Sequence, residues 1–272
     1  KNLSSSFSLF HLIKHIIFLF LFIRQNKFDT VHAHSTIPGI SVRFCSILLK
    51  FNCVFTVHGW GWRGFRPLKK KTIQYLEKTL KIFSNCSYIF VCNAVKTEGV
   101  STLGVFRNSK VVLNSIDIAI IDDQSNAELD FPYQNTKNIG MIARVDRSKD
   151  HSTLLTAFNR VSLPCNLHLV GDGTDDVEFI KYSKHLCNIR KDDIVFWGEM
   201  QSAISIIKNL DALVICSNFE AFPNVLVEAI SANIPVIASA VGGIPEICRY
   251  GCEIELFQPG DFDTLTLLID KQ

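Results

Sequence analysis

Short apolar strands alternate with helical stretches along almost the whole chain, and this alternation limits the folds open to it. The strand segments are continuous apolar runs, such as Tyr88–Cys92 (YIFVC) and Leu213–Cys216 (LVIC). Continuous runs are typical of strands that are buried on both faces. Because strands and helices take turns, the pattern predicts parallel sheets with crossover helices. The predicted fold class is therefore α/β.

The alternation is interrupted once. The segment from Ile118 to Thr136, IAIIDDQSNAELDFPYQNT, is acidic and polar, contains turn formers and Pro132, and is typical of a linker. We therefore predict an N-terminal Rossmann-like domain at 1–118, a linker at 119–136 and a C-terminal Rossmann-like domain at 137–272. Two doubly wound domains of this kind hold a ligand in a cleft at the carboxyl ends of their strands.

Composition excludes several classes of protein. The chain has 272 residues, of which 47% are hydrophobic and 20% charged, so it can bury a core and is not disordered. A net charge of +2 argues against a dedicated nucleic-acid binder. Nine scattered cysteines without a CxxC pair indicate reduced, mostly buried cytosolic thiols. The closest pair, Cys248 and Cys252, lacks the further ligands that a metal site needs.

The two ends of the chain indicate a fragment. The sequence begins at Lys1 rather than methionine, and it ends just after an apolar helical stretch, Thr264–Ile269. The opening segment Phe7–Ile23 is very apolar, but its uninterrupted run covers only Ile16–Ile23, whereas a membrane span needs about 20 apolar residues. No small-residue cleavage site follows it. We expect a helix packed in the domain, with a helix lying on a membrane surface as the alternative.

The stretch from Ser217 to Pro245 contains the strongest functional pattern. Glu220 precedes a helix predicted at Val225–Ala232, and Glu228 lies about two turns inside it, so the two carboxylates are on the order of 10 Å apart. The free N–H groups of the helix start lie between them and favour an anion. A nucleotide-sugar, with hydroxyls at both ends and phosphate in the middle, fits this layout. The alternative is a buried βαβ unit with two solvated glutamates.

The whole pattern is more specific than its parts. Two glutamates eight positions apart, Phe222-Pro223-Asn224 between them, and the sequence GGIPE at 242–246 resemble the retaining glycosyltransferases of family 4, which have the GT-B fold. The resemblance runs from about Phe28 to Asp261, and Ala221 departs from it by replacing a glycine. It implies a hexosyltransferase that moves a sugar from a nucleotide diphosphate sugar to a glycan or lipid-linked acceptor. It also implies retention of configuration, no bound metal and no other cofactor.

The resemblance assigns donor binding to the second half. Arg144 and Lys149 would clamp the diphosphate, Glu228 would bind the ribose, and Glu220 would bind the donor sugar and take part in catalysis. Backbone groups near the donor would come from Gly171, Gly173, Phe222, Pro223 and Asn224. Taken alone, Arg144 and Lys149 also fit a solvated basic loop in which Asp146 and Asp150 neutralise them.

Other residues match stretches that line the family's cleft. His58 would contact the donor sugar or orient the reacting groups. His34 and Ser35 would line the cleft nearby, and the loop that contains Gly59 and Trp60 is suited to stacking on a sugar. Gly198 and Glu199 resemble the loop that meets the nucleotide base. In addition, the sequence from Asn114 to Asp117 resembles an Asn-Gly-Ile-Asp turn, with serine in place of glycine.

Two rival functions come from other classes. A nucleotide-sugar epimerase of the same fold would act without an acceptor and would need further acid and base carboxylates in the cleft. An inert nucleotide-sugar-binding fragment is favoured by the ends of the chain and by Ala221. For the main interpretation we expect a role in polysaccharide or cell-envelope glycan synthesis. The expected location is the cytoplasm, with the cytoplasmic membrane face as a peripheral site.

Overall fold

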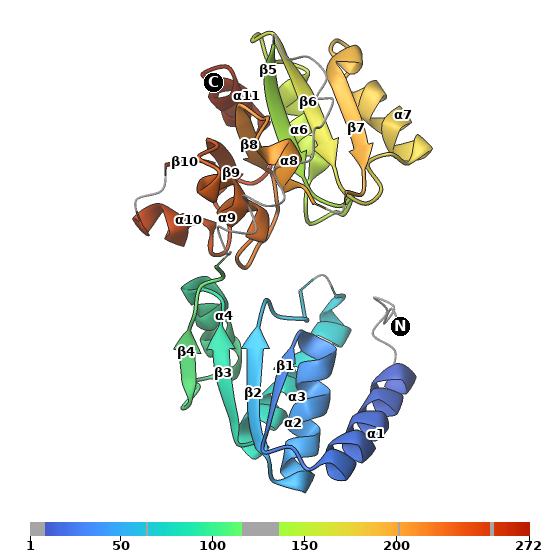
Figure 1. Ribbon diagram of the computed structural model, residues 1–272, viewed down its shortest axis with the longest axis vertical. Coiled ribbons are helices and arrows are strands. Elements are labelled where there is room, and N and C mark those ends of the chain that lie inside the picture. The colour runs from blue at the N-terminus through green and yellow to red at the C-terminus, as the bar shows by residue number, and fades with distance from the viewer. Residues whose placement is uncertain (1–8, 64, 116–135, 201, 251–252) are drawn as a thin grey trace. The chain divides into compact units, whose positions relative to one another are not determined.

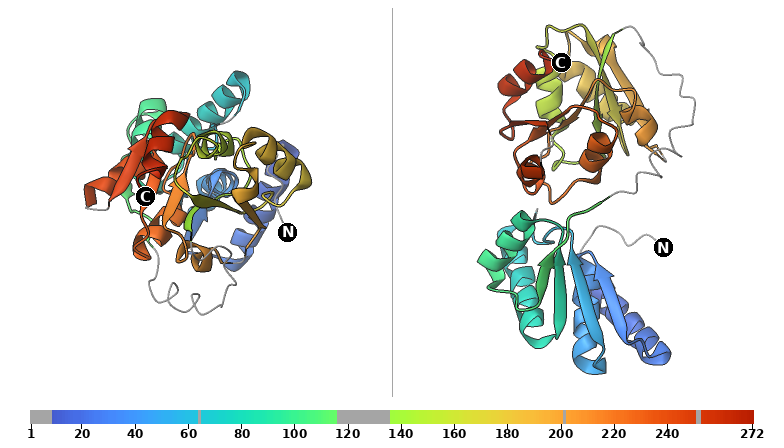
Figure 2. Two further views of the ribbon diagram at one scale, coloured as in Figure 1. Left: turned by 90° about the horizontal axis from the view of Figure 1, so that it is seen from above. Right: turned by 60° about the vertical axis from the view of Figure 1, so that its left-hand side comes forward.

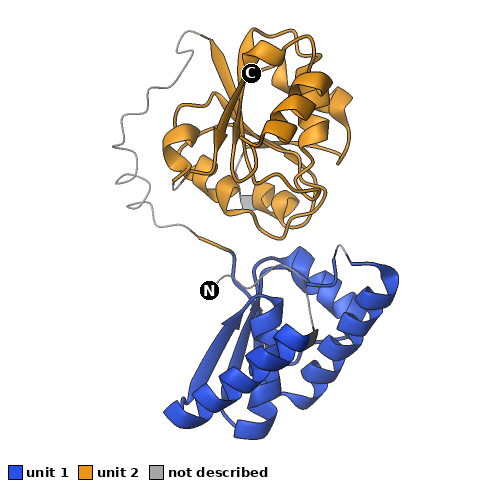
Figure 3. Ribbon diagram, turned by 90° about the vertical axis from the view of Figure 1, so that its right-hand side faces the viewer, with its two compact units in different colours: residues 1–113 blue, residues 114–272 orange. Residues whose placement is uncertain are grey.

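The computed structural model describes residues 9–63, 65–115, 136–200, 202–250 and 253–272. The chain divides into two compact units, Lys1–Leu113 and Asn114–Gln272 (Figure 3). Each unit contains one parallel sheet with helices packed on it, so the predicted α/β class is confirmed. The linker predicted at 119–136 falls almost entirely outside the described residues.

Unit 1 has a four-stranded parallel sheet in which the strands follow chain order, β1-β2-β3-β4 (Figure 1). Its helices are α1 (Leu9–Asn26), α2 (Thr36–Leu49), α3 (Pro67–Phe83) and α4 (Asn93–Leu103). Its strands are β1 (Thr30–His34), β2 (Asn52–Val57), β3 (Cys86–Phe90) and β4 (Ser109–Val111).

The interior of unit 1 holds a buried ion pair. Arg43 of α2 and Glu77 of α3 lie 2.7 Å apart, and both side chains are almost fully buried. The Arg43 guanidinium also donates to the Tyr88 hydroxyl at 3.3 Å and lies over the Phe55 ring, 4.5 Å from its centroid. Two buried charges are tolerated because each compensates the other, so removing either partner would leave an uncompensated charge.

Helix α1 is packed on one face only. Leu12 and Ile23 are buried, and Leu12 joins a cluster with Ile40 of α2 and Leu80 of α3. The predicted domain helix is therefore present, with residues 7 and 8 outside the described part. Along the rest of α1 a second set of large apolar side chains is exposed: Phe10, Ile13, Ile17, Phe18, Leu21 and Phe22.

Strand β1 departs from the prediction of burial on both faces. Its residues follow the pattern exposed, intermediate, exposed, buried, exposed, and only Ala33 is buried. The reason is its position, because β1 pairs with β2 alone and forms an edge of the described sheet. The sequence of this strand, TVHAH, is also the least apolar of the predicted strands.

Unit 2 has a six-stranded parallel sheet with the order β10-β9-β8-β5-β6-β7 (Figures 1 and 2). Its strands are β5 (Lys137–Ile142), β6 (Cys165–Val170), β7 (Ile194–Gly198), β8 (Ala212–Ile215), β9 (Val236–Ser239) and β10 (Ile254–Phe257). Its α-helices are α6 (His151–Phe158), α7 (Val177–Leu186), α8 (Ile204–Ile207), α9 (Asn224–Ser231), α10 (Ile244–Ile247) and α11 (Phe262–Ile269).

The centre of this sheet is fully covered. Every residue of β6, β8 and β9 is buried, as their apolar runs predict. The strand order also reverses here, because the chain runs from β5 through β6 to β7 on one side and then returns to place β8 on the other side of β5. Such a reversal leaves a crevice outside the carboxyl ends of the two strands that flank it, which is where doubly wound sheets bind ligands.

Candidate functional site

The loops that follow β5 and β8 flank the reversal of strand order in unit 2. The loop after β5 carries Arg144 and Lys149, and the loop after β8 carries Glu220. The two loops are joined by the backbone, because Asn218 N–H donates to the Ser148 carbonyl at 2.7 Å. The Asn218 side-chain amide also donates, at 3.0 Å, to a carbonyl of the same β5 loop. The crevice is therefore bordered by two loops held in a fixed relation.

Lys149 and Glu220 form an ion pair across this crevice. Their side chains retain 25% and 12% exposure, so the pair is accessible but largely desolvated. Ser217 donates to the same Glu220 carboxylate at 2.7 Å, and Ser239 of β9 in turn donates to the Ser217 carbonyl at 2.6 Å. The carboxylate of Glu220 is thereby held by the Lys149 ammonium and by the hydroxyl of Ser217, whose backbone is bonded to β9.

The two aspartates of the β5 loop form no direct ion pair with its basic residues among the described contacts. Asp146 accepts from the Ser148 N–H and hydroxyl at 2.8 and 2.6 Å, and these hydrogen bonds lower the pKa of Asp146. Asp150 accepts from the amide and hydroxyl of Thr153 and so caps α6. The alternative of a locally neutralised basic loop is therefore incomplete for Lys149, whose ion-pair partner is Glu220.

Arg144 is exposed at the end of β5. Among the ion pairs of the described residues, none involves its guanidinium. It is therefore a charged group at the crevice that is available to a ligand.

The start of α9 is held by a distant asparagine. Phe222 is buried and Pro223 occupies the N-cap position, so α9 begins at Asn224, within one residue of the predicted start. The Asn114 side-chain amide donates to the Phe222 carbonyl at 3.2 Å and to Asn224 Oδ1 at 3.1 Å. The first-turn amides of a helix lack intrahelical acceptors, so this fixed end offers N–H groups beside Glu220.

Glu228 lies on the second turn of α9 and is half-buried. Desolvation by burial raises the pKa of this carboxyl group above its ordinary value. Among the described residues, no basic side chain forms an ion pair with it. A half-buried carboxylate without a cation is suited to accept hydrogen bonds from hydroxyl groups.

Glycines let the loops of the carboxyl edge approach one another. The φ values of Gly171, Gly173 and Gly198 are 132°, 83° and 71°, a region that residues with a Cβ atom rarely adopt. A Cβ atom at Gly171 would lie 2.5 Å from the Ala143 carbonyl oxygen, so the loops after β5 and β6 touch through their backbones. Gly171 N–H donates to the Gly198 carbonyl at 2.8 Å, while Glu199 beyond it is exposed.

Gly242 packs against the backbone turn at Glu220 and Ala221, which we call the Glu220 elbow, and the local sequence did not indicate this contact. Its φ is 56°, and a Cβ atom there would lie only 1.6 Å from the Glu220 carbonyl oxygen. The neighbouring Gly243 N–H donates to the Ala221 carbonyl at 2.8 Å. Gly242 and Gly243 therefore pack directly against the backbone of the elbow. Ser217, Asn218 and Gly242 thus have supporting roles that their local sequence did not reveal.

In unit 1, a row of histidines lies at the carboxyl ends of β1 and β2. His34 Nδ1 and His58 Nε2 are 2.9 Å apart, so one ring donates to the other. The ring of His32 lies 4.3 Å from that of His34, and its Nε2 is 2.7 Å from Thr56 Oγ1. Burial, His34 and His32 lower the pKa of His58, in that order. Two predicted residues, His34 and His58, therefore lie together, and sequence reasoning missed His32.

The predicted aromatic stacking loop is wrong for Trp60. Trp60 is 4% exposed and Trp62 is 1% exposed, and their rings stack on each other with centroids 4.4 Å apart. The Trp60 indole N–H donates to the Val95 carbonyl at 2.9 Å, and its ring packs against Phe106. These rings belong to the core of unit 1. Gly59 and Ser35, by contrast, are exposed beside the histidines.

No cluster of three or more histidine, cysteine, aspartate or glutamate side chains with a geometry suited to a metal ion occurs among the described residues. None of the helices within the same residues combines the length and apolarity needed to cross a bilayer.

Two family models match the chain, one in each half. Residues 136–270 match the family described as glycosyl transferases group 1, and residues 3–120 match glycosyltransferase family 4. An uncharacterized protein encoded in a cps region of Klebsiella pneumoniae is 28% identical over the whole chain and 75% of its own length.

Another relative is the UDP-Gal:alpha-D-GlcNAc-diphosphoundecaprenol alpha-1,3-galactosyltransferase of Escherichia coli. It is 27% identical over 89% of this chain and 65% of its own length. The match to the N-acetyl-alpha-D-glucosaminyl L-malate synthase of Bacillus anthracis likewise covers 63% of that protein. The chain therefore spans about two thirds of the length of these curated relatives.

Solved structures show the same fold. HepE of Anabaena in complex with UDP superposes with a TM-score of 0.80 at 20% identity, over 94% of this chain and 71% of that chain. The HepE complex with UDP-glucose has a TM-score of 0.81 at the same identity and coverage. These likenesses confirm the predicted GT-B fold, which combines two Rossmann-like domains.

Proposed function

We propose, from the premise that this chain belongs to the group 1 and family 4 glycosyltransferases, that it is a retaining hexosyltransferase using a nucleotide diphosphate sugar. The observation that carries the proposal is the pair of loops after β5 and β8, joined by the Lys149–Glu220 ion pair beside the start of α9. The acceptor is a glycan or a lipid-linked glycan in polysaccharide or cell-envelope synthesis. The names of the relatives support this choice.

The diphosphate is assigned to Arg144 and Lys149. An ammonium group has three donors, so Lys149 can keep its bond to Glu220 and still donate to a phosphate oxygen. Arg144 has no ion-pair partner among the described residues and can supply a bidentate contact. Together with the N-terminus of α9, these groups offset the charge that develops on the leaving diphosphate, so no metal is required.

The hydroxyl groups at the two ends of the donor are assigned to the two glutamates. Glu228 accepts from the ribose hydroxyls, because its half-buried carboxylate has acceptor capacity and no competing cation in the described structure. Glu220 accepts from the sugar hydroxyls, and its orientation is set by Lys149 and Ser217. Gly171, Gly173, Gly198 and Glu199 complete the donor side of unit 2.

Retention is proposed to proceed without an enzyme nucleophile. The leaving phosphate oxygen accepts the proton of the attacking acceptor hydroxyl while the new glycosidic bond forms on the same face of the sugar. His58 is assigned a contact with the reacting sugar, and His34, 2.9 Å from it, fixes the orientation of its ring. The acceptor side is assigned to unit 1.

A donor screen tests the proposal. The chain would be mixed with a panel of nucleotide diphosphate sugars, stabilisation would be measured by thermal shift, and products formed with candidate acceptors would be identified by mass. Transfer of a sugar to the acceptor supports the proposal. Isomerised donor without acceptor would instead support the epimerase, and a thermal shift without any product would support the inert binding fragment.

A peripheral membrane contact is proposed in addition, because α1 exposes six large apolar side chains on the face away from α2. Lys14 lies within this face, with its Nζ 4.2 Å from the Phe10 ring centroid. Each Lys near an anionic surface contributes about 1 kcal/mol, so Lys14→Glu should weaken binding to phosphatidylglycerol vesicles by about tenfold or more. Lys181→Glu, at an exposed site on α7, is the matched control. Equal binding by both variants would contradict the contact.

A further inference from the structure

Two cysteines of unit 1 lie side by side at the start of neighbouring strands. Cys53 of β2 and Cys86 of β3 are register partners, and their sulfur atoms are 3.1 Å apart. Register partners in a parallel sheet project from the same face, and neighbouring strands are about 4.8 Å apart. This spacing is within the Cα separation of roughly 4.4–6.8 Å that a disulfide spans. The two thiols can therefore be joined with little movement of the backbone.

The surroundings of the pair favour ionisation of one thiol, Cys53. The buried guanidinium of Arg43 lies close enough to interact with both thiols. The hydrogen bond with Cys86 and the charge of Arg43 lower the pKa of Cys53, against the effect of burial. The same hydrogen bond, together with burial and the charges of Cys53 and Glu77, raises the pKa of Cys86. Of the two thiols, Cys53 is therefore the one whose ionisation the surroundings favour.

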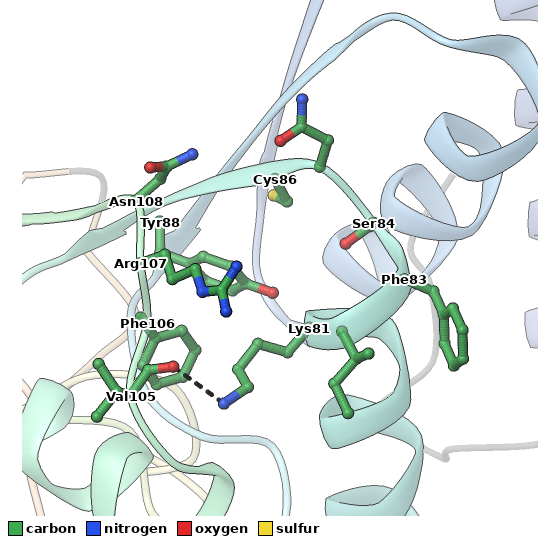
Figure 4. Close-up of a pocket in the computed structure, with 11 residues that line it drawn as sticks. Lys81, Phe83, Ser84, Cys86, Tyr88, Val105, Phe106, Arg107 and Asn108 are labelled. Atoms are coloured by element: carbon green, nitrogen blue, oxygen red, sulfur yellow. Dashed lines mark hydrogen bonds between the residues drawn. The ribbon is translucent and has the colours of Figure 1, made fainter.

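The pair lies beside a hollow that Cys86 helps to line. Cys86 lines a hollow of about 520 Å³ whose walls also include Lys81, Tyr88, Phe106 and Arg107 (Figure 4). Lys81 forms part of the wall by donating to the Val105 carbonyl at 3.1 Å. Cys86 itself is 6% exposed and Cys53 only 2%. A small uncharged reagent can therefore approach the pair from the side of Cys86.

We propose that Cys53 and Cys86 form a redox-active dithiol that a hydroperoxide oxidises to an intramolecular disulfide. The Cys53 thiolate, whose pKa is lowered, attacks the peroxide oxygen. The O–O bond breaks, Cys53 becomes a sulfenic acid, and the leaving alkoxide or hydroxide takes a proton. Cys86 then attacks the Cys53 sulfur across the 3.1 Å contact, the S–O bond breaks, and hydroxide leaves with the Cys86 proton as water. Two thiols and one hydroperoxide thus yield one disulfide, one alcohol and one water.

This chemistry distinguishes the pair from other buried cysteines. Burial raises the pKa of Cys45, Cys165, Cys187 and Cys216, which makes each of them less reactive. Cys45 provides a matched control, because it is buried in the same unit and its sulfur contacts a backbone carbonyl at 3.8 Å. The dithiol lies at the amino ends of its strands, whereas His58 follows the carboxyl end of β2. The proposal is therefore independent of the glycosyltransferase assignment.

Peptide mapping tests the dithiol without any substrate. The purified chain would be treated with hydrogen peroxide, denatured in an alkylating agent, digested and analysed by mass spectrometry without reduction. We expect a linked pair of peptides containing Cys53 and Cys86, an intact mass lower by two hydrogen atoms, and full reversal by dithiothreitol. Cys45→Ala should behave as the wild type, while Cys86→Ala should form no linked peptide.

Phenylarsine oxide provides a second test that needs no variant. Phenylarsine oxide condenses with two neighbouring thiols and releases one water, so the wild-type chain should bind one equivalent at this pair. This binding should protect Cys53 and Cys86 from alkylation. A wild-type chain in which peroxide links other cysteines, over-oxidises Cys53 without a link or leaves both thiols reduced would overturn the proposal. Alkylation of both thiols in the presence of the arsenical would overturn it as well.

Discussion

Replacing Gly242 by alanine should displace the Glu220 elbow. The added Cβ atom would lie 1.6 Å from the Glu220 carbonyl oxygen, whereas real Cβ contacts are essentially never shorter than 3.0 Å. The elbow or the glycine turn must therefore move by about 1.4 Å, the difference between these two distances. Because the obstacle is backbone rather than a flexible side chain, no rotamer change can relieve it.

Two effects add up in this variant. Alanine at a φ of 56° costs about 1–2 kcal/mol from the left-handed conformation alone. The steric overlap should cost a further 1–3 kcal/mol or so, as overpacking typically does. Gly260→Ala separates the two effects, since Gly260 has a φ of 79° and no atom within 4 Å of the added Cβ. We therefore expect Gly242→Ala to be the more destabilising variant by roughly 1–3 kcal/mol.

The assay combines urea unfolding with calorimetric titration of the donor found in the screen. A displacement of about 1 Å at a reacting group can reduce a rate on the order of a hundredfold. Gly242→Ala should accordingly lose both donor affinity and transfer, and Gly260→Ala should retain them. Equal free energies of unfolding for the two variants, together with unchanged donor affinity, would refute the role assigned to the glycine turn.

Two further predictions concern carboxylates and histidines. Glu228→Gln should weaken binding of the free nucleoside diphosphate, because that ligand contains the ribose. Glu220→Gln should weaken binding only when the sugar is attached. Calorimetry that shows equal losses of affinity for the free nucleotide in both variants would contradict the proposed donor orientation. Burial lowers the pKa of His151 and His168 to about 4, below the ordinary 6.5, so the unfolded chain takes up protons first. The stability that the two neutral histidines contribute should therefore be fully present above about pH 6.5. As the pH drops toward 4, the free energy of unfolding should fall by up to about 1.4 kcal/mol per pH unit for each histidine. His168→Gln should flatten this slope in urea titrations, and an unchanged slope would contradict the assignment.

Most strands could be predicted because their signal is local. Continuous apolar runs located the centre of the unit 2 sheet, where burial on both faces requires such runs. Strand β10 (Ile254–Phe257) escaped prediction, since its sequence IELF is short and only Phe257 is buried. Strand β1 was found, but its burial was overestimated, because its position at a sheet edge depends on strand order rather than on its own residues.

The errors at the candidate site have a common cause. The alternative interpretation of Lys149 paired it with neighbouring aspartates, whereas its ion-pair partner Glu220 lies 71 positions further along the chain. Trp60 has the composition of a sugar-stacking loop, yet Val95 and Phe106 from later elements cover it. Such long-range contacts are set by how the elements pack. Sequence reasoning therefore named candidate site residues through the family resemblance and misjudged the contacts of some of them.

The most direct test of the donor site is the affinity of Arg144→Ala for the nucleoside diphosphate that gives the largest thermal shift. Arg147→Ala is the matched control, because it removes the same charge from the same loop and both side chains are exposed. A charge-assisted hydrogen bond contributes about 1.5–3 kcal/mol, so calorimetry should show binding weakened by roughly tenfold to a hundredfold for Arg144→Ala. Arg147→Ala should stay within about twofold of the wild type. Wild-type affinity in Arg144→Ala, or an equal loss in both variants, would contradict the proposed diphosphate clamp.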